Sequence, residues 1–134
     1  MLNLRFKTSD FLKYWVPVFL WAGLIFTFSS FPTGTASEIV WTDFFVKKTA
    51  HIVEYAIFTV LLYRAFVGHN MDKGRAFVAA ILIAMVYGLS DEYHQTFVSG
   101  RTGKIRDVGF DTIGACLAVL IVKQKRLAEK LDLL

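Results

Sequence analysis

Three short stretches of this largely apolar, 134-residue chain combine acidic side chains with basic or histidine side chains. A carboxylate near a histidine can exchange protons as acid and base, or hold a hard metal ion. Basic side chains suit phosphate and carboxylate groups. We take the following residues as candidates for a polar site: Lys48, His51, Glu54, Tyr55, Asp91, Glu92, His94, Gln95, Arg101, Asp107 and Asp111.

The first stretch runs from Lys48 to Tyr55. On a helix, spacings of three and four residues place Lys48, His51 and Tyr55 on one face, and Glu54 lies three residues from His51. Such a stripe can face a site, or it can be the interfacial start of a helix with Lys48 and Tyr55 anchored among headgroups. The second interpretation suits Lys47 and Lys48 at least as well. Charge within a spanning helix is costly, which favours a site role for His51 and Glu54.

The second stretch holds two adjacent carboxylates, Asp91 and Glu92, followed by His94 and Gln95. Both carboxylates cannot point at lipid, so they either face other helices or form a cap and a water-facing helix end. The chain has no H-E-x-x-H motif and no paired cysteines. We therefore assign no metal ligands and expect no cofactor, while these ligand types leave a metal open.

The third stretch begins at Arg101, in a short loop. Its guanidinium suits a phosphorylated headgroup, and pairing with Asp91 or Asp107 is an equally good alternative. Asp107, Asp111 and Gly114 share one face of the helix expected to follow. Asp107 also suits a helix N-terminus electrostatically, an explanation that fits Asp111 poorly. Neither a G-x-S-x-G motif nor a phosphate-binding loop is present, so catalytic residues stay unassigned and enzymatic activity is undecided.

Apolar segments must position these residues. Hydrophobic residues make up 55% of the chain and charged residues 19%, with a mean hydropathy of +0.49. We predict an all-α fold with one domain over residues 1–134. It is a membrane-embedded bundle of four transmembrane helices, near 12–31, 44–67, 75–97 and 107–126, with a polar cluster at the extracytoplasmic end. The alternatives are a soluble four-helix bundle and, for the first segment, a signal peptide cleaved within 33–36.

The distribution of basic residues predicts the orientation. With the N-terminus inside, the inner set is Arg5, Lys7, Lys13, Arg64, Lys73, Arg75, Lys123, Lys125, Arg126 and Lys130, and the outer set is Lys47, Lys48, Arg101, Lys104 and Arg106. The excess on the inner side favours a multi-pass protein of the cell membrane with both termini cytoplasmic. Segment order alone then places all three polar stretches at the outer face of the membrane.

Three motifs in this order resemble the VanZ-like family. They are K-x-x-H-x-x-E-Y from Lys48 to Tyr55, Y-G-x-x-D-E-x-x-Q-x-F from Tyr87 to Phe97, and R-x-G-x-x-x-D-x-x-x-D-x-x-G from Arg101 to Gly114. Together they span about half the chain. Many family members have Asn in the last motif where this chain has Asp111. The family takes its name from a bacterial membrane protein that gives low-level teicoplanin resistance, so the resemblance implies a bacterial multi-pass protein of the cell envelope.

Three functional hypotheses follow. The first is binding of an anionic lipid or glycolipid through Lys48, Arg101 and His51, with a possible link to glycopeptide resistance. The second is an enzyme that acts on a lipid-linked phosphate or cell-wall precursor, with His51 or Glu92 as acid or base. The third is a purely structural polar network. The expected partners are the bilayer and such a lipid. Nucleic acid is not expected, because the basic residues form no single patch, and the sequence leaves the oligomeric state open.

Overall fold

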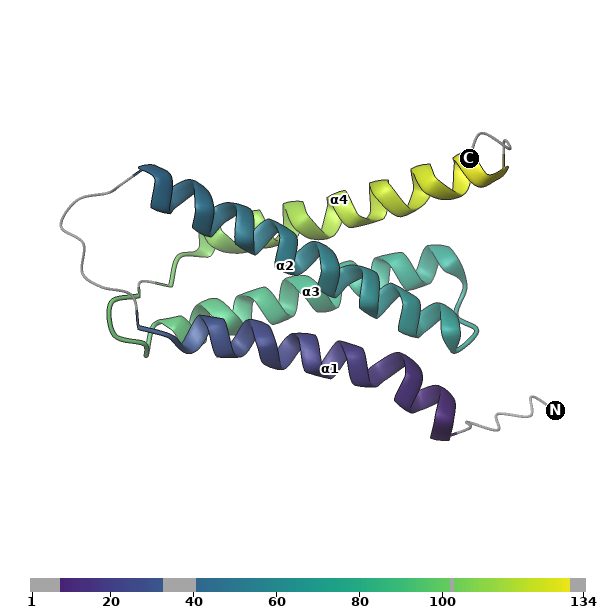
Figure 1. The fold of residues 1–134 in the computed structure, drawn as a ribbon, viewed down its shortest axis with the longest axis horizontal. Helices are drawn as coiled ribbons and strands as arrows, with labels where there is room; N and C mark the ends of the chain where they lie inside the picture. The colour runs from purple at the N-terminus through teal and green to yellow at the C-terminus, as the bar shows by residue number, and fades with distance from the viewer. Residues whose placement is uncertain (1–7, 33–40, 102, 131–134) are drawn as a thin grey trace.

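The computed structural model describes residues 8–32, 41–101 and 103–130, which form four α-helices and no strand (Figure 1). The helices are α1 (Thr8–Ser30), α2 (Trp41–Gly68), α3 (Lys73–Gln95) and α4 (Ile105–Lys130). The expectation of an all-α fold is confirmed. The signal-peptide cleavage site considered within 33–36 lies outside the described residues.

Each helix begins a few residues before the apolar run that predicted it, because polar residues also form the first turn. The start of α3 illustrates this. Asp72 precedes the helix, and its Oδ1 accepts hydrogen bonds from the backbone amides of Gly74 and Arg75, both at 3.1 Å. A capping carboxylate satisfies amides that have no partner within the helix. At α3 the capping residue therefore sets the start of the helix, and hydrophobicity alone does not.

Helices α2 and α3 form the centre of the bundle, since each packs against the other three. The chain runs up and down, so that the C-terminal ends of α1 and α3 and the N-terminal ends of α2 and α4 lie at one end (Figure 1). We call this the polar end. The first residues of α1 and the last residues of α4 lie at the opposite end. All three polar stretches of the sequence therefore meet at the polar end.

Small residues on α3 allow close packing at the centre. Ala76, Ala80 and Ala84 recur every four residues and are at most 1% exposed. Small side chains at this spacing let neighbouring helices approach closely. Larger side chains fill the space around them, and the rings of Tyr63 and Phe77 stack with their centroids 3.9 Å apart. The apolar core therefore occupies the bundle away from the polar end.

The outer surface of the bundle is also apolar. Leu20, Val78 and Val86 are each at least 60% exposed. Three described helices, Thr8–Ser30, Phe45–Gly68 and Lys73–Gln95, are long and apolar enough to cross a membrane. Apolar side chains on both the inner and outer faces are expected of helices in lipid, and they argue against the soluble bundle. Helix α4 does not reach the same hydropathy, because charged residues occupy both of its ends.

Candidate functional site

Six of the eleven candidate residues are buried at the polar end. They are Tyr55 on α2, Asp91, Glu92 and Gln95 on α3, and Asp107 and Asp111 on α4. Charged side chains are almost never fully buried unless they are paired, so this burial requires an explanation from the partners of each residue.

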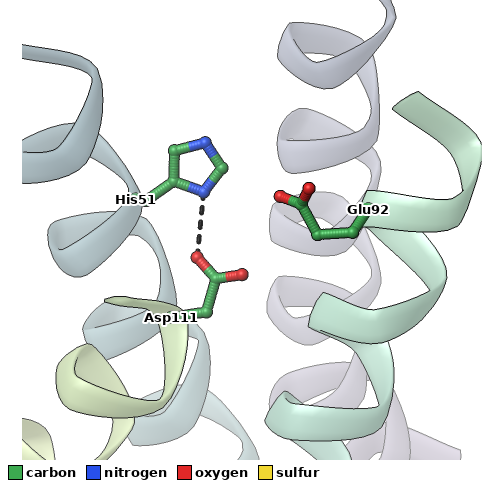
Figure 2. A group of neighbouring side chains, drawn as sticks. All are labelled: His51, Glu92 and Asp111. Carbon is green, nitrogen blue, oxygen red and sulfur yellow. Dashed lines mark hydrogen bonds and ion pairs between the residues drawn. The ribbon is translucent and has the colours of Figure 1, made fainter. Parts of the chain in front are cut away.

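The centre of the site is a pair formed by His51 and Asp111. The His51 Nδ1 lies 2.9 Å from the Asp111 Oδ1, and the Asp111 side chain is completely buried. Figure 2 shows the Glu92 carboxylate pointing toward this pair from α3. One possible ligand atom from each of His51, Glu92 and Asp111 lies within 4.8 Å of the others. Three helices thus bring one imidazole and two carboxylates to a single point.

The loop before α4 holds Glu92 in position. The backbone amide of Lys104 donates a hydrogen bond to the Glu92 Oε2 at 2.7 Å. This contact requires the loop to pass against the end of α3, and a Cβ added to Gly103 would overlap the carbonyl oxygen of Glu92. Glycine is therefore needed at position 103 for the loop to reach the carboxylate.

Two further polar pairs surround the centre. Lys48 on α2 forms an ion pair with Asp107 on α4, and the Lys48 Nζ lies 5.3 Å from the centre of the Phe110 ring. On α3, the Gln95 Nε2 donates a hydrogen bond to the Asp91 Oδ2 at 2.9 Å. Lys48 thus compensates one of the buried carboxylates.

Two glycines make the close approach of the helices possible. A Cβ added to Gly114 on α4 would overlap the carbonyl oxygen of Ile52 on α2. A Cβ added to Gly88 on α3 would lie 3.0 Å from the Asp111 Oδ2 and 3.5 Å from the Tyr55 ring. The sequence interpretation did not identify Gly88 and Gly103 as site residues, although both lie within the motifs that carry the family resemblance.

Two candidates have partners outside the centre, and a third interacts with His51 from its edge. The His94 Nε2 lies 3.0 Å from the Ser30 Oγ, and its ring packs against Phe26 of α1. Arg101 donates from Nε and Nη2 to the backbone carbonyls of Phe31 and Phe28, at 3.0 and 2.8 Å. It therefore caps the C-terminal end of α1, a role that the sequence interpretation did not consider. Glu54 is half-buried and interacts electrostatically with His51.

At the centre of the polar end, four buried oxygen atoms have no hydrogen-bond partner among the described residues. They are the Tyr55 hydroxyl, the Asp91 Oδ1, the Glu92 Oε1 and the Asp111 Oδ2. Most buried polar groups in proteins are hydrogen-bonded, so several such atoms in one place are unusual. The centre of the polar end therefore has acceptor capacity that its own side chains do not use.

These features define a class of protein: an all-helical chain with membrane-length helices and a buried charged cluster at one end of the bundle. The family described as VanZ/LLP1 matches residues 11–128, and the chain belongs to this family. The resemblance inferred from the three motifs is thereby confirmed. The match extends well beyond those motifs and includes parts of all four helices.

The chain is also similar to a protein of Schizosaccharomyces pombe that is described as uncharacterized protein C11E3.10. The two are 32% identical over 89 residues, which cover 64% of this chain and 53% of the yeast protein. The chain therefore matches about half the length of this curated relative. No solved structure matches. Because this relative is fungal, the bacterial source implied by the resemblance stays a prediction.

Proposed function

We propose that this protein crosses the membrane four times and binds an anionic lipid headgroup at the polar end of its bundle. One observation carries the proposal: acidic and basic side chains from α2, α3 and α4 converge at one end of an otherwise apolar structure. Ionisable groups within membrane-spanning helices are costly and usually serve a function. Lys48 and Arg101 are partly exposed there and have the charge that a phosphate or carboxylate headgroup requires.

Two observations support the orientation. The start of α1 and the end of α4 lie at the same end of the bundle, as four spans require (Figure 1). Most basic residues also belong to that end or to the segments next to it. Both termini are then cytoplasmic and the polar end faces the outside. A lipid-linked cell-wall precursor is one anionic lipid found on that side, and it would connect the site to glycopeptide (teicoplanin) resistance.

Cys116 tests the fourth span, because it is exposed on the surface of α4. If α4 crosses the membrane, lipid covers this thiol and suppresses formation of the reactive thiolate. We expect a maleimide reagent to leave Cys116 unlabelled in intact vesicles and to label it after the protein is unfolded in detergent. Ile105→Cys in a Cys116→Ala background is the matched control, since Ile105 is 81% exposed at the start of α4. Equal labelling of both cysteines in vesicles would contradict the span.

Loss of a basic residue at the polar end should weaken headgroup binding. We expect Lys48→Gln or Arg101→Gln to reduce the affinity for phosphatidylglycerol about fivefold, because one basic residue near an anionic surface contributes about 1 kcal/mol. Native mass spectrometry of protein taken from nanodiscs of phosphatidylglycerol and phosphatidylcholine would measure this. Any release of the headgroup during incubation would favour the enzymatic alternative, for which the His51–Asp111 pair is suited.

Lys123→Gln provides the matched control, because Lys123 is exposed on α4 toward the opposite end and the substitution makes the same change in charge. Thermal unfolding in detergent would identify a variant that is simply destabilised, since Lys48 and Arg101 both make contacts within the protein. A reduction as large in Lys123→Gln as in the other two variants would show that net charge, and not the polar end, governs lipid binding.

A further inference from the structure

The three converging side chains at the polar end have the composition of a metal site. His51, Glu92 and Asp111 supply one imidazole and two carboxylates from three helices, with ligand atoms within 4.8 Å of one another (Figure 2). Atoms bound to one ion at about 2.1 Å lie at most about 4.2 Å apart. The His51 Nδ1 and the Asp111 Oδ1 are 2.9 Å apart, so an ion bound by both atoms would replace the proton that they share and release it to solvent. A small inward movement of Glu92 would complete the set.

The charge balance also favours a cation at this point. Lys48 compensates Asp107, but Glu92 and Asp111 lie close together with His51 as the basic group beside them. Glu92 is 5% exposed and Asp111 is 1% exposed. Carboxylates removed from water need a compensating positive charge, and a divalent cation supplies it directly.

The unpartnered oxygens provide a second and independent observation. In each carboxylate one oxygen is held by the protein: the Asp111 Oδ1 contacts His51, and the Glu92 Oε2 accepts from the amide of Lys104. The other oxygens, the Asp111 Oδ2 and the Glu92 Oε1, are buried without a hydrogen-bond partner in the described part of the chain. Metal-binding carboxylates are commonly oriented through such hydrogen bonds. Gly88 lacks the Cβ that would lie 3.0 Å from the Asp111 Oδ2.

We propose that His51, Glu92 and Asp111 bind one divalent transition-metal ion, with Mn²⁺ or Zn²⁺ as the best-suited ions. An imidazole with two carboxylates fits these ions, whereas Mg²⁺ and Ca²⁺ prefer ligand sets made only of oxygen. Three protein ligands leave coordination positions for water or for an oxygen atom of a phosphate. The inference does not rest on the proposed lipid, because metal binding is measured without it.

The test uses the full chain, purified in detergent without a histidine tag and treated with chelator. We expect the wild-type protein to bind about one Mn²⁺ or Zn²⁺ per chain by mass spectrometric metal analysis, and to unfold at a higher temperature when the ion is present. His51→Gln, Glu92→Gln and Asp111→Asn should each weaken binding at least tenfold. Asp91→Asn is the matched control, because it removes a neighbouring buried carboxylate that lies outside the three ligands.

Metal binding by the wild-type protein tests the proposal even if a variant fails to fold. Absence of bound Mn²⁺ and Zn²⁺ at millimolar concentrations of the free ions would overturn the proposal. So would equal binding of Mg²⁺, because the histidine would then have no part in selection. Loss of binding in Asp91→Asn equal to that in Asp111→Asn would overturn the assignment of the three ligands. None of these results depends on whether phosphatidylglycerol binds, so the two proposals can fail separately.

Discussion

Replacing Gly114 with alanine is expected to destabilise the helix bundle by about 3 kcal/mol, the upper part of the range for an overpacked core. The added methyl group would overlap the carbonyl oxygen of Ile52, which belongs to the backbone of α2 and cannot rotate away. Helices α2 and α4 would have to separate, and the His51–Asp111 pair connects the same two helices. Unfolding in mixed detergent micelles, followed by circular dichroism, would measure the change in free energy.

Gly109 provides the matched control for this substitution. It lies on the same helix, and a Cβ added there would meet nothing within 4 Å. Alanine has a higher helix propensity than glycine, so Gly109→Ala should be neutral or stabilise the protein by up to about 1 kcal/mol. Changes of opposite sign in the free energy of unfolding of the two variants would establish that α2 and α4 cross closely at Gly114. Equal destabilisation would mean that a methyl group added at either position of α4 destabilises the protein, whatever it contacts.

Replacing Asp111 with alanine is the second substitution expected to have a large effect. Removal of one partner of a buried pair typically costs 3 to 5 kcal/mol, and we expect about 3 kcal/mol here because the His51 side chain is still 16% exposed. The completely buried side chain of Asp111 also fills space between α2 and α3, next to Gly88 and Tyr55. The free energy of unfolding should be measured after treatment with chelator, so that loss of a bound metal ion does not contribute.

A double-mutant cycle separates the pair from the lost volume. His51→Ala alone should also destabilise the protein, and the double variant should lose at least about 1 kcal/mol less than the two single losses combined. This difference measures the interaction between the two side chains, because the lost volume contributes to both singles and to the double. Additive losses within about 0.5 kcal/mol would contradict a direct interaction between His51 and Asp111.

The helices could be predicted because lipid-facing and core-facing residues are both apolar, so length and hydropathy locate them. The prediction for α4 is weaker, because it depends on the same two properties, length and hydropathy. Its apolar part is short and contains Asp111, so its hydropathy does not distinguish a span from a helix packed on others. Helix boundaries were also inexact, because capping residues such as Asp72 extend a helix beyond its apolar run.

Within the site, the direction of each side chain depended on helix rotation. Successive residues on a helix are turned by about 100°, so residues three positions apart need not share a partner. Asp91 and His94 illustrate this: Asp91 faces the buried side of α3, whereas His94 contacts Ser30 on α1. Arg101 lies in a loop whose path no periodicity describes, and its partners are the last carbonyls of α1.

The sequence by itself determined that charged residues from three separate segments meet at one end of a helical bundle, because alternating helix directions follow from the order of the segments. It also determined the family, through three motifs with fixed spacing. Only the tertiary structure decided that His51, Glu92 and Asp111 converge, while His94 and Arg101 bind to α1. The reason is physical: residues far apart in sequence are brought within a few ångströms by the rotation and close approach of helices, which depends on Gly88 and Gly114. The path of the loop before α4 also contributes, and it depends on Gly103.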